Sequence, residues 1–149
     1  MSNGQLILLV EDNDDDAELT VMAFKQAMIT NEVVRVYDGV EALDYLFARG
    51  THLGRDAALM PVIVLLDLKL PRLGGLEVLT AIRADPRTRH LPVIILTSSV
   101  EDRDRTAAYD QCVNSYVQKP IDYDQFVVAA RQLGLYWMVL NIPPPRRTE

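Results

Sequence analysis

The sequence predicts an α/β fold in which helices cover both faces of a five-stranded parallel sheet. Two observations predict it: five short apolar runs alternate with segments of helical period, and several of these runs are continuous. A continuous run of branched residues such as 62–66 is typical of a strand buried on both faces, as in parallel sheets between helix layers. The predicted strands are residues 6–10, 33–36, 62–66, 93–96 and 115–117.

Helix signals fill the segments between these strands. The first helix is expected to open near Asp15 or Asp16, because carboxylates favour a helix N-terminus. The other four are expected after Gly39, at Gly74-Gly75, from Glu101 to Gln111, and after Asp122 towards Asn141. Periodic apolar positions predict side chains that face the core: Leu19, Met22, Phe24 and Ala27 in the first helix, Ala42, Leu43, Leu46 and Phe47 in the second, and Leu76, Leu79 and Ile82 in the third. Residues 49–60 lack a clear period, which predicts a long loop.

Length and composition limit the classes of protein that fit. The 149 residues suit one domain, expected over 1–142, with a Pro/Arg-rich tail over 143–149 that we expect to be disordered. A net charge of -6 disfavours binding to nucleic acid. The single Cys112, the lack of a signal-peptide pattern and the shortness of the apolar runs favour a cytoplasmic protein that does not enter a membrane.

Chemically active side chains follow four of the predicted strands. Glu11 and Asp12 follow the first strand, Asp67 the third, Thr97 the fourth and Lys119 the fifth. Because ligands of open parallel sheets bind at the carboxyl ends of the strands, these groups should meet at one rim. Three clustered carboxylates repel one another unless a cation such as Mg²⁺ lies between them. Beside such an ion, Asp67 could attack a phosphoryl group whose charge Lys119 and the Thr97 hydroxyl would help to stabilise.

Each of these residues also has an ordinary structural explanation. An acidic pair after a strand is often a capped helix start, a lone aspartate is often a turn residue, and a lysine is usually a surface charge. The prediction therefore depends on the coincidence of these residue types at four strand ends.

These residues and their surroundings resemble the response-regulator receiver family of two-component signalling. The resemblance is carried by LILLVEDNDDDAEL, VIVLLDLKLPRLGGLEVLTAIR, LPVIILTSS and NSYVQKPID. It implies a flavodoxin-like, doubly wound sheet and a histidine kinase that phosphorylates Asp67. The implied Mg²⁺ ligands are Glu11, Asp12, Asp67 and the main-chain carbonyl of Lys69, and the implied phosphoryl contacts are Thr97 and Lys119.

Further features follow from the same resemblance. Thr97 and Tyr116 are implied to shift together on phosphorylation, and Lys119-Pro120 is implied to be a cis peptide bond. Tyr116 taken alone would be an ordinary core aromatic. The acidic pair is Glu-Asp where Asp-Asp is commoner in the family, so that Glu11 could reach the metal directly or through water.

Two segments resemble a narrower group, the single-domain regulators that serve bacterial phytochromes. They are the loop at 49–60 and the C-terminal run LGLYWMVLN, and they imply a bacterial phytochrome as the histidine kinase. From residue 133 the apolar residues surround the helix axis, which predicts an interface, and a two-fold homodimer is the simplest closed solution. The alternative is a bend at Gly134 that returns the segment to its own core. The predicted dimer residues are Leu133, Leu135, Tyr136, Trp137, Val139 and Leu140.

Three other classes fit the sequence less well. A haloacid-dehalogenase-like phosphatase with a Mg²⁺-dependent aspartate nucleophile needs a second acid two residues on, where this chain has Lys69. A flavodoxin-like cofactor binder needs a phosphate-binding loop after the first strand, where this chain has acids. A transcription factor needs a recognition helix, and too few residues follow Asn141 to supply one.

Overall fold

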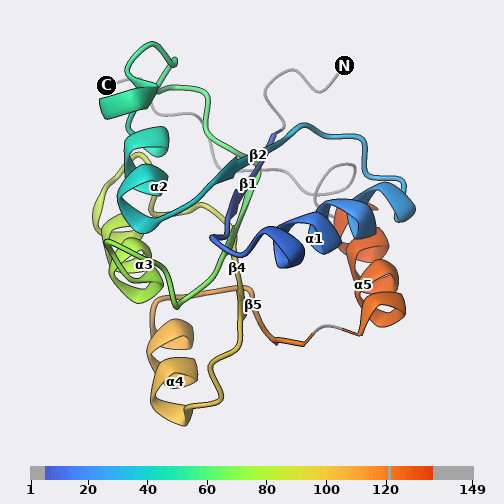
Figure 1. Cartoon of the computed structure of the whole chain (residues 1–149). Coiled ribbons are helices and arrows are strands. Elements are labelled where there is room, and N and C mark those ends of the chain that lie inside the picture. The colour runs from blue at the N-terminus through green and yellow to red at the C-terminus, as the bar shows by residue number, and fades with distance from the viewer. Residues whose placement is uncertain (1–5, 121, 136–149) are drawn as a thin grey trace.

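The computed structural model describes residues 6–120 and 122–135, which form one parallel sheet between two helix layers. The strand order is β2-β1-β3-β4-β5, which is the order of the flavodoxin-like, doubly wound sheet that the resemblance implied. Helices α1 and α5 cover one face, and α2, α3 and α4 cover the other (Figure 1). In chain order the elements are β1 (Ile7–Val10), α1 (Asp14–Gln26), β2 (Val33–Val36), α2 (Gly39–Leu46), the 3₁₀ helix η1 (Gly50–His52), β3 (Ile63–Leu66), α3 (Gly75–Ala84), β4 (Val93–Thr97), α4 (Asp102–Asp110), β5 (Ser115–Gln118) and α5 (Tyr123–Leu135).

The central strands β1, β3 and β4 are buried on both faces, which explains their continuous apolar runs. Successive residues of a strand point to opposite faces, so Leu8 and Val10 pack under α2 and α3 while Ile7 and Leu9 pack under α1 and α5. Val10 pairs with Leu66 across β1 and β3. The residues that follow these strands therefore leave the sheet side by side.

Helix α1 begins one residue earlier than the sequence predicted. The Asn13 side chain accepts a hydrogen bond of 2.9 Å from the backbone N–H of Asp16 and so caps the helix. The prediction that Met22 faces the core was wrong, because this side chain is 50% exposed. The buried stripe lies on the opposite side of the helix, and Leu19 lies half-buried at its border. The buried stripe consists of Ala17, Thr20, Ala23 and Phe24.

Residues 49–60 form the predicted connection before β3, but they contain the short helix η1 and pack against α2. The short helix η1 packs against α2, where the Tyr45 ring is buried. His52 contacts that ring edge-on at 5.1 Å between centroids, and the Arg55 guanidinium lies 4.1 Å from the ring centroid. Arg55 also donates to the backbone carbonyls of Tyr45 and Leu59. The loop thus gains a fixed conformation from cationic and aromatic side chains instead of from apolar periodicity.

The C-terminal predictions concern residues that are mostly outside the described part. Helix α5 is described to Leu135, with Val127 and Ala130 buried against the α1 side of the sheet. Tyr136, Trp137, Val139 and Leu140, the side chains of Leu133 and Leu135, and the predicted tail at 143–149 lie outside the described residues. Among the described helices, none has the length and apolar character needed to cross a membrane.

Candidate functional site

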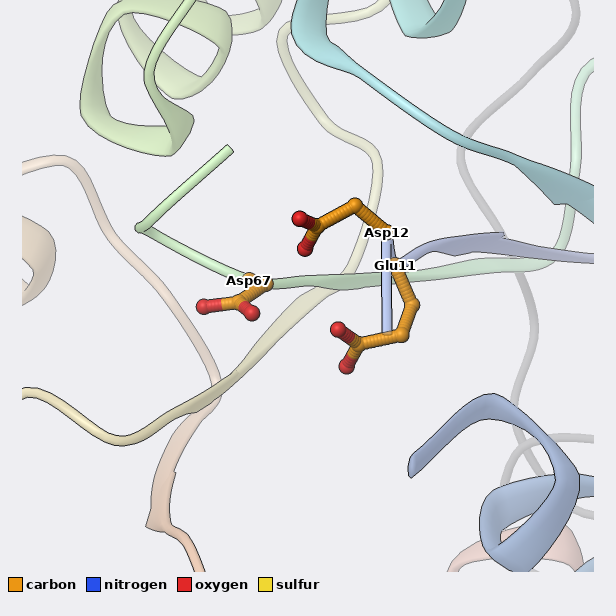
Figure 2. A group of neighbouring side chains, drawn as sticks. All are labelled: Glu11, Asp12 and Asp67. Atoms are coloured by element: carbon orange, nitrogen blue, oxygen red, sulfur yellow. The ribbon is translucent and has the colours of Figure 1, made fainter. Parts of the chain in front are cut away.

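The strand ends bring the three predicted carboxylates together. Glu11 directly follows β1 and Asp67 directly follows β3, and the paired ends of these strands place the two residues next to each other. Glu11, Asp12 and Asp67 each offer an oxygen within 4.8 Å of the others, and their carboxylates border one common space (Figure 2). Glu11 is 1% exposed and Asp67 is 6% exposed, whereas Asp12 is exposed. The cluster therefore has two buried members and one that faces solvent.

The Lys119 ammonium contacts the two buried carboxylates of the cluster, Glu11 and Asp67. Its Nζ lies 2.6 Å from Glu11 Oε1, 3.1 Å from Asp67 Oδ2 and 2.9 Å from Asp16 Oδ2. An ammonium has three N–H donors, so these three carboxylates use its full capacity. Continued pairing of β4 with β5 places Lys119 here, because the backbone N–H of Lys119 donates to Thr97 O at 2.8 Å. The implied cis bond between Lys119 and Pro120 is present.

Burial and charge shift the protonation of this cluster. Burial raises the pKa of Glu11 from 4.5 to about 7; the Lys119 ammonium opposes the rise and the Asp67 charge adds to it. Burial alone would lower the pKa of Lys119, but hydrogen bonds to Glu11 and Asp16 together with the Asp67 charge hold that pKa above its ordinary value. Lys119 is therefore a permanent cation, and Glu11 is the acid of the cluster that can gain a proton near neutral pH.

The Asp67 carboxylate is oriented from both of its oxygens. The backbone N–H of Lys69 donates to Oδ1 at 3.1 Å, and Lys119 donates to Oδ2. Gly75 starts α3 against this turn, and its N–H donates to Leu68 O at 2.9 Å. A Cβ at Gly75 would lie 2.1 Å from Asp67 O, so only glycine permits this close approach. The β3–α3 turn thereby holds Asp67 in one orientation.

Thr97 lies at the end of β4 and is fully buried. Its Oγ1 accepts from the backbone N–H of Ser99 at 3.3 Å, and Ser99 Oγ donates to Asp104 Oδ2 on α4 at 2.5 Å. The Tyr116 hydroxyl reaches Ser99 O at 3.5 Å, a long and weak contact. The hydroxyl of Thr97 is thus connected through one short loop to α4 and to the predicted switch residue Tyr116.

The donor set fits a hard divalent cation. Mg²⁺ prefers oxygen ligands and keeps several waters, so a cluster with two buried carboxylates and one at the solvent boundary is suitable. Within the described residues no hydrogen bond or ion pair engages the Asp12 carboxylate, which leaves both of its oxygens available. Glu11 has one oxygen on Lys119, and its Oε2 accepts from Asn13 N at 3.2 Å.

Two contributors to the site were missed from the sequence. Asp16 was interpreted only as a helix-start residue, although its Oδ2 lies 2.9 Å from Lys119 Nζ. Arg35, within β2, donates to Glu11 O at 3.0 Å and pairs with Asp14 at 2.9 Å. The signal for Arg35 was a charged residue inside an otherwise apolar strand run.

Comparison with known proteins agrees with this geometry. The response regulator receiver domain matches residues 7–131. The protein described as probable methanogenesis regulatory protein FilR2 of Methanothrix harundinacea is 40% identical over 139 residues, which cover 93% of this chain and 87% of FilR2. Response regulator Rcp1 of Synechocystis is 31% identical over 134 residues, which cover 90% of this chain and 89% of Rcp1.

Two solved structures share the fold along nearly the whole chain. The Mn²⁺-bound form of Rcp1 superposes with a TM-score of 0.80 at 30% identity, covering 95% of this chain and 99% of the other. The phosphorylated cyanobacterial phytochrome response regulator RcpA superposes with a TM-score of 0.81 at 34% identity and the same coverage. This chain therefore belongs to the response regulator receiver domain family, and it is a response regulator of two-component signalling related to the phytochrome response regulators.

Proposed function

We propose that this response regulator accepts one phosphoryl group from a phosphohistidine on Asp67 and signals through the conformational change that follows. The observation that carries the proposal is the orientation of the buried Asp67 carboxylate, with Lys69 N–H on Oδ1 and Lys119 on Oδ2. An oxygen of Asp67 would attack phosphorus, forming an O–P bond while the P–N bond of the phosphohistidine breaks and the imidazole leaves. Lys119 would neutralise charge on the transferred oxygens.

A divalent ion, with Mg²⁺ as the expected one, would be held by Glu11, Asp12, Asp67 and the main-chain carbonyl of Lys69. When bound, the ion supplies neutralisation of the negative charge that collects on the phosphoryl oxygens. Support comes from the three convergent carboxylates and from the relative Rcp1, whose structure contains Mn²⁺. Because Glu11 already uses its Oε1 on Lys119, this longer side chain could reach the ion directly through Oε2 or through a water.

Thr97 and Tyr116 would transmit the reaction to the surface. The Thr97 hydroxyl now accepts from Ser99 N–H, and its own O–H would donate to an oxygen of a phosphoryl group on Asp67 and draw Thr97 toward it. A shift of Thr97 would release the loop that connects β4 to α4, whose Ser99 O is also the partner of the Tyr116 hydroxyl. A ligand shifts a switch only as far as it favours one state, and the new contacts to Thr97 and Lys119 would supply that preference.

The kinase we propose is a bacterial phytochrome. Support comes from the likeness to RcpA, a phytochrome response regulator whose structure is phosphorylated.

We also propose a homodimer through the C-terminal run that includes Trp137 and Leu140. Its support is the apolar sequence after residue 133. Light scattering over a range of concentrations should give twice the chain mass, and Trp137→Glu should reduce it. A monomeric wild-type chain, phosphorylated or not, would remove the dimer from the proposal.

Intact-mass analysis tests the phosphorylation. The chain is incubated with acetyl phosphate, with and without Mg²⁺, and with an autophosphorylated phytochrome kinase. We expect the mass of one added phosphoryl group only when Mg²⁺ is present, and none for Asp67→Asn. Asp56→Asn is a matched control, because Asp56 lies on the loop that precedes β3, away from the cluster. Equal phosphorylation of wild type and Asp67→Asn would sink the proposal.

A further inference from the structure

Arg35 lies in β2 and joins the sheet to the loop between β1 and α1. Its Nε donates to Glu11 O at 3.0 Å, and its Nη1 pairs with Asp14 Oδ1 at 2.9 Å. Its guanidinium lies over the Tyr37 ring, 4.1 Å from the centroid. Within the described residues its Nη2 is buried and has no hydrogen-bond partner. The side chain is thus held in one place by contacts on both sides of residue 12.

These contacts fix the two ends of a very short segment. Glu11 is held at its carbonyl, Asp14 is paired at its carboxylate although this side chain is 85% exposed, and Asp12 lies between them. On the inner side, Asn13 N–H donates to Glu11 Oε2, and the Asn13 side chain caps α1. The Asp12 carboxylate itself has no partner among the described residues. Its position is therefore determined by the backbone on either side of it. That backbone is tied to β2 by the Glu11 N–H, which donates to Val36 O at 3.1 Å, and by the Arg35 side chain.

We propose that Arg35 is a positioning residue for the metal site: it fixes the segment from Glu11 to Asp14 and thereby places the Asp12 carboxylate toward Glu11 and Asp67. The inference rests on the proposed binding of a divalent cation by this cluster. Arginine suits the role because its planar fork donates from separate nitrogens at a fixed spacing, Nε to the carbonyl and Nη1 to the carboxylate, whereas a lysine donates from a single nitrogen. The Nη2, which is buried and has no hydrogen-bond partner among the described residues, is an unfavourable feature of this arrangement.

Charge and position have opposite effects at this site. The Arg35 cation repels a divalent ion, so its loss alone would strengthen binding on electrostatic grounds. The loss of Asp14 alone would weaken binding on the same grounds. A double variant Arg35→Gln/Asp14→Asn removes one charge of each sign and leaves the net charge unchanged, so that the lost positioning becomes the dominant effect. Mutation of a residue that orients a metal ligand without touching the metal commonly lowers metal affinity by about 10- to 100-fold.

The test is a calorimetric titration of the full chain with Mg²⁺ and, in parallel, Mn²⁺. We expect Arg35→Gln/Asp14→Asn to bind both ions about tenfold more weakly, while its thermal melting without metal stays close to that of wild type. Arg131→Gln is the matched control, because Arg131 also bonds a backbone carbonyl of α1, that of Gln26 at the far end of the helix. The control should bind the ions as wild type does.

Arg35→Lys serves if the double variant does not fold, since it keeps the cation but replaces the two spaced donor nitrogens, Nε and Nη1, by a single nitrogen. It should also lose affinity for both ions. Binding within twofold of wild type in the folded double variant, or in Arg35→Lys, would overturn the positioning role. A wild-type chain that binds neither Mg²⁺ nor Mn²⁺ would instead contradict the proposed function itself, and the role of Arg35 would fall with it.

Discussion

The buried and exposed halves of the carboxylate cluster are stabilised in different ways. The buried half consists of Glu11 and Asp67, and its charge is balanced inside the protein by Lys119. The exposed half is Asp12, which has no partner among the described residues and depends on the loop around it for its position. The buried half is thus complete without a ligand. The exposed half has free oxygen ligands that only a cation or water can use.

This difference separates what holds the fold together from what binds the ion. A buried charge without a partner is strongly unfavourable, so any change to Lys119 should affect stability. An exposed carboxylate without a partner contributes little to stability, so changes to Asp12 should affect binding alone.

Lys119→Ala should give the largest effect. It leaves Glu11 and Asp67 buried without their cation, and removal of one member of a buried ion pair costs about 3 kcal/mol or more. Urea unfolding without Mg²⁺ measures this loss in the free energy of unfolding. The variant should still accept some phosphoryl group, but the amide chemical-shift changes at Thr97 and Tyr116 on phosphorylation should shrink. Wild-type stability together with unchanged shifts would leave Lys119 with neither role.

Asp12→Asn should weaken Mg²⁺ binding by more than about tenfold, since one of three anionic ligands becomes neutral. Its free energy of unfolding without Mg²⁺ should change by less than about 0.5 kcal/mol. The melting temperature without Mg²⁺ reports the stability of the variant, and the rise in melting temperature on addition of Mg²⁺ reports the binding. If the rise is the same in Asp12→Asn and in wild type, Asp12 is not a ligand.

The pH dependence follows from Glu11. Because its pKa in the folded chain is raised from 4.5 to about 7, the folded state holds a proton that the unfolded state has lost between these values. The stability contributed by this group is fully present below pH 4.5 and is lost as the pH rises through about 7. Protons and Mg²⁺ compete for the site, so Mg²⁺ affinity should rise with pH and level off above neutrality. At one pH unit below the pKa, affinity should be about tenfold lower.

Glu11→Gln separates this effect from other pH effects. Its Mg²⁺ affinity should be weaker throughout, and the rise between mildly acidic and neutral pH should largely disappear. A wild-type affinity that is already flat from pH 5.5 to 8 would contradict the raised pKa of Glu11.

The smallest effect is expected for Asp16→Asn. Asp16 is partly exposed and uses one of the three Lys119 donors, which must turn to an incoming phosphoryl group. Its removal should speed phosphorylation by acetyl phosphate about two- to fivefold, the size expected for a partly exposed ion pair. Asp15→Asn is the matched control, because Asp15 is exposed and lies in the same turn of α1. Equal rates in the two variants would show that Asp16 does not restrain Lys119.

The sequence predicted the sheet and its rim because both depend on local patterns. Continuous apolar runs identified β1, β3 and β4, and polar residues directly after strands identified Glu11, Asp67 and Thr97. Side-chain partners that depend on three-dimensional placement were not predictable in the same way. Arg35 enters the site through its contact with Glu11, which is 24 residues away along the chain. Asp16 enters it through its contact with Lys119, which is 103 residues away.

Two further differences have the same origin. The burial of Met22 was predicted from the apolar positions along the first helix, whereas the observed helix α1 packs against α5 with the stripe through Ala17 and Phe24. The loop at 49–60 has no apolar period in its sequence. Its conformation is held instead by the contacts of His52 and Arg55 with the Tyr45 ring. In each case the decisive interaction is tertiary.

Reductive trapping tests the central claim, that Asp67 is the phosphoacceptor, most directly. Borohydride reduces an aspartyl phosphate to homoserine, so phosphorylation in the presence of Mg²⁺ followed by reduction and peptide mapping marks the residue that carried the phosphoryl group. The account predicts homoserine at position 67 and unmodified residues at Glu11 and Asp12. Reduction at Glu11 or Asp12 with Asp67 intact, or a stable phosphate elsewhere that borohydride does not remove, would contradict it.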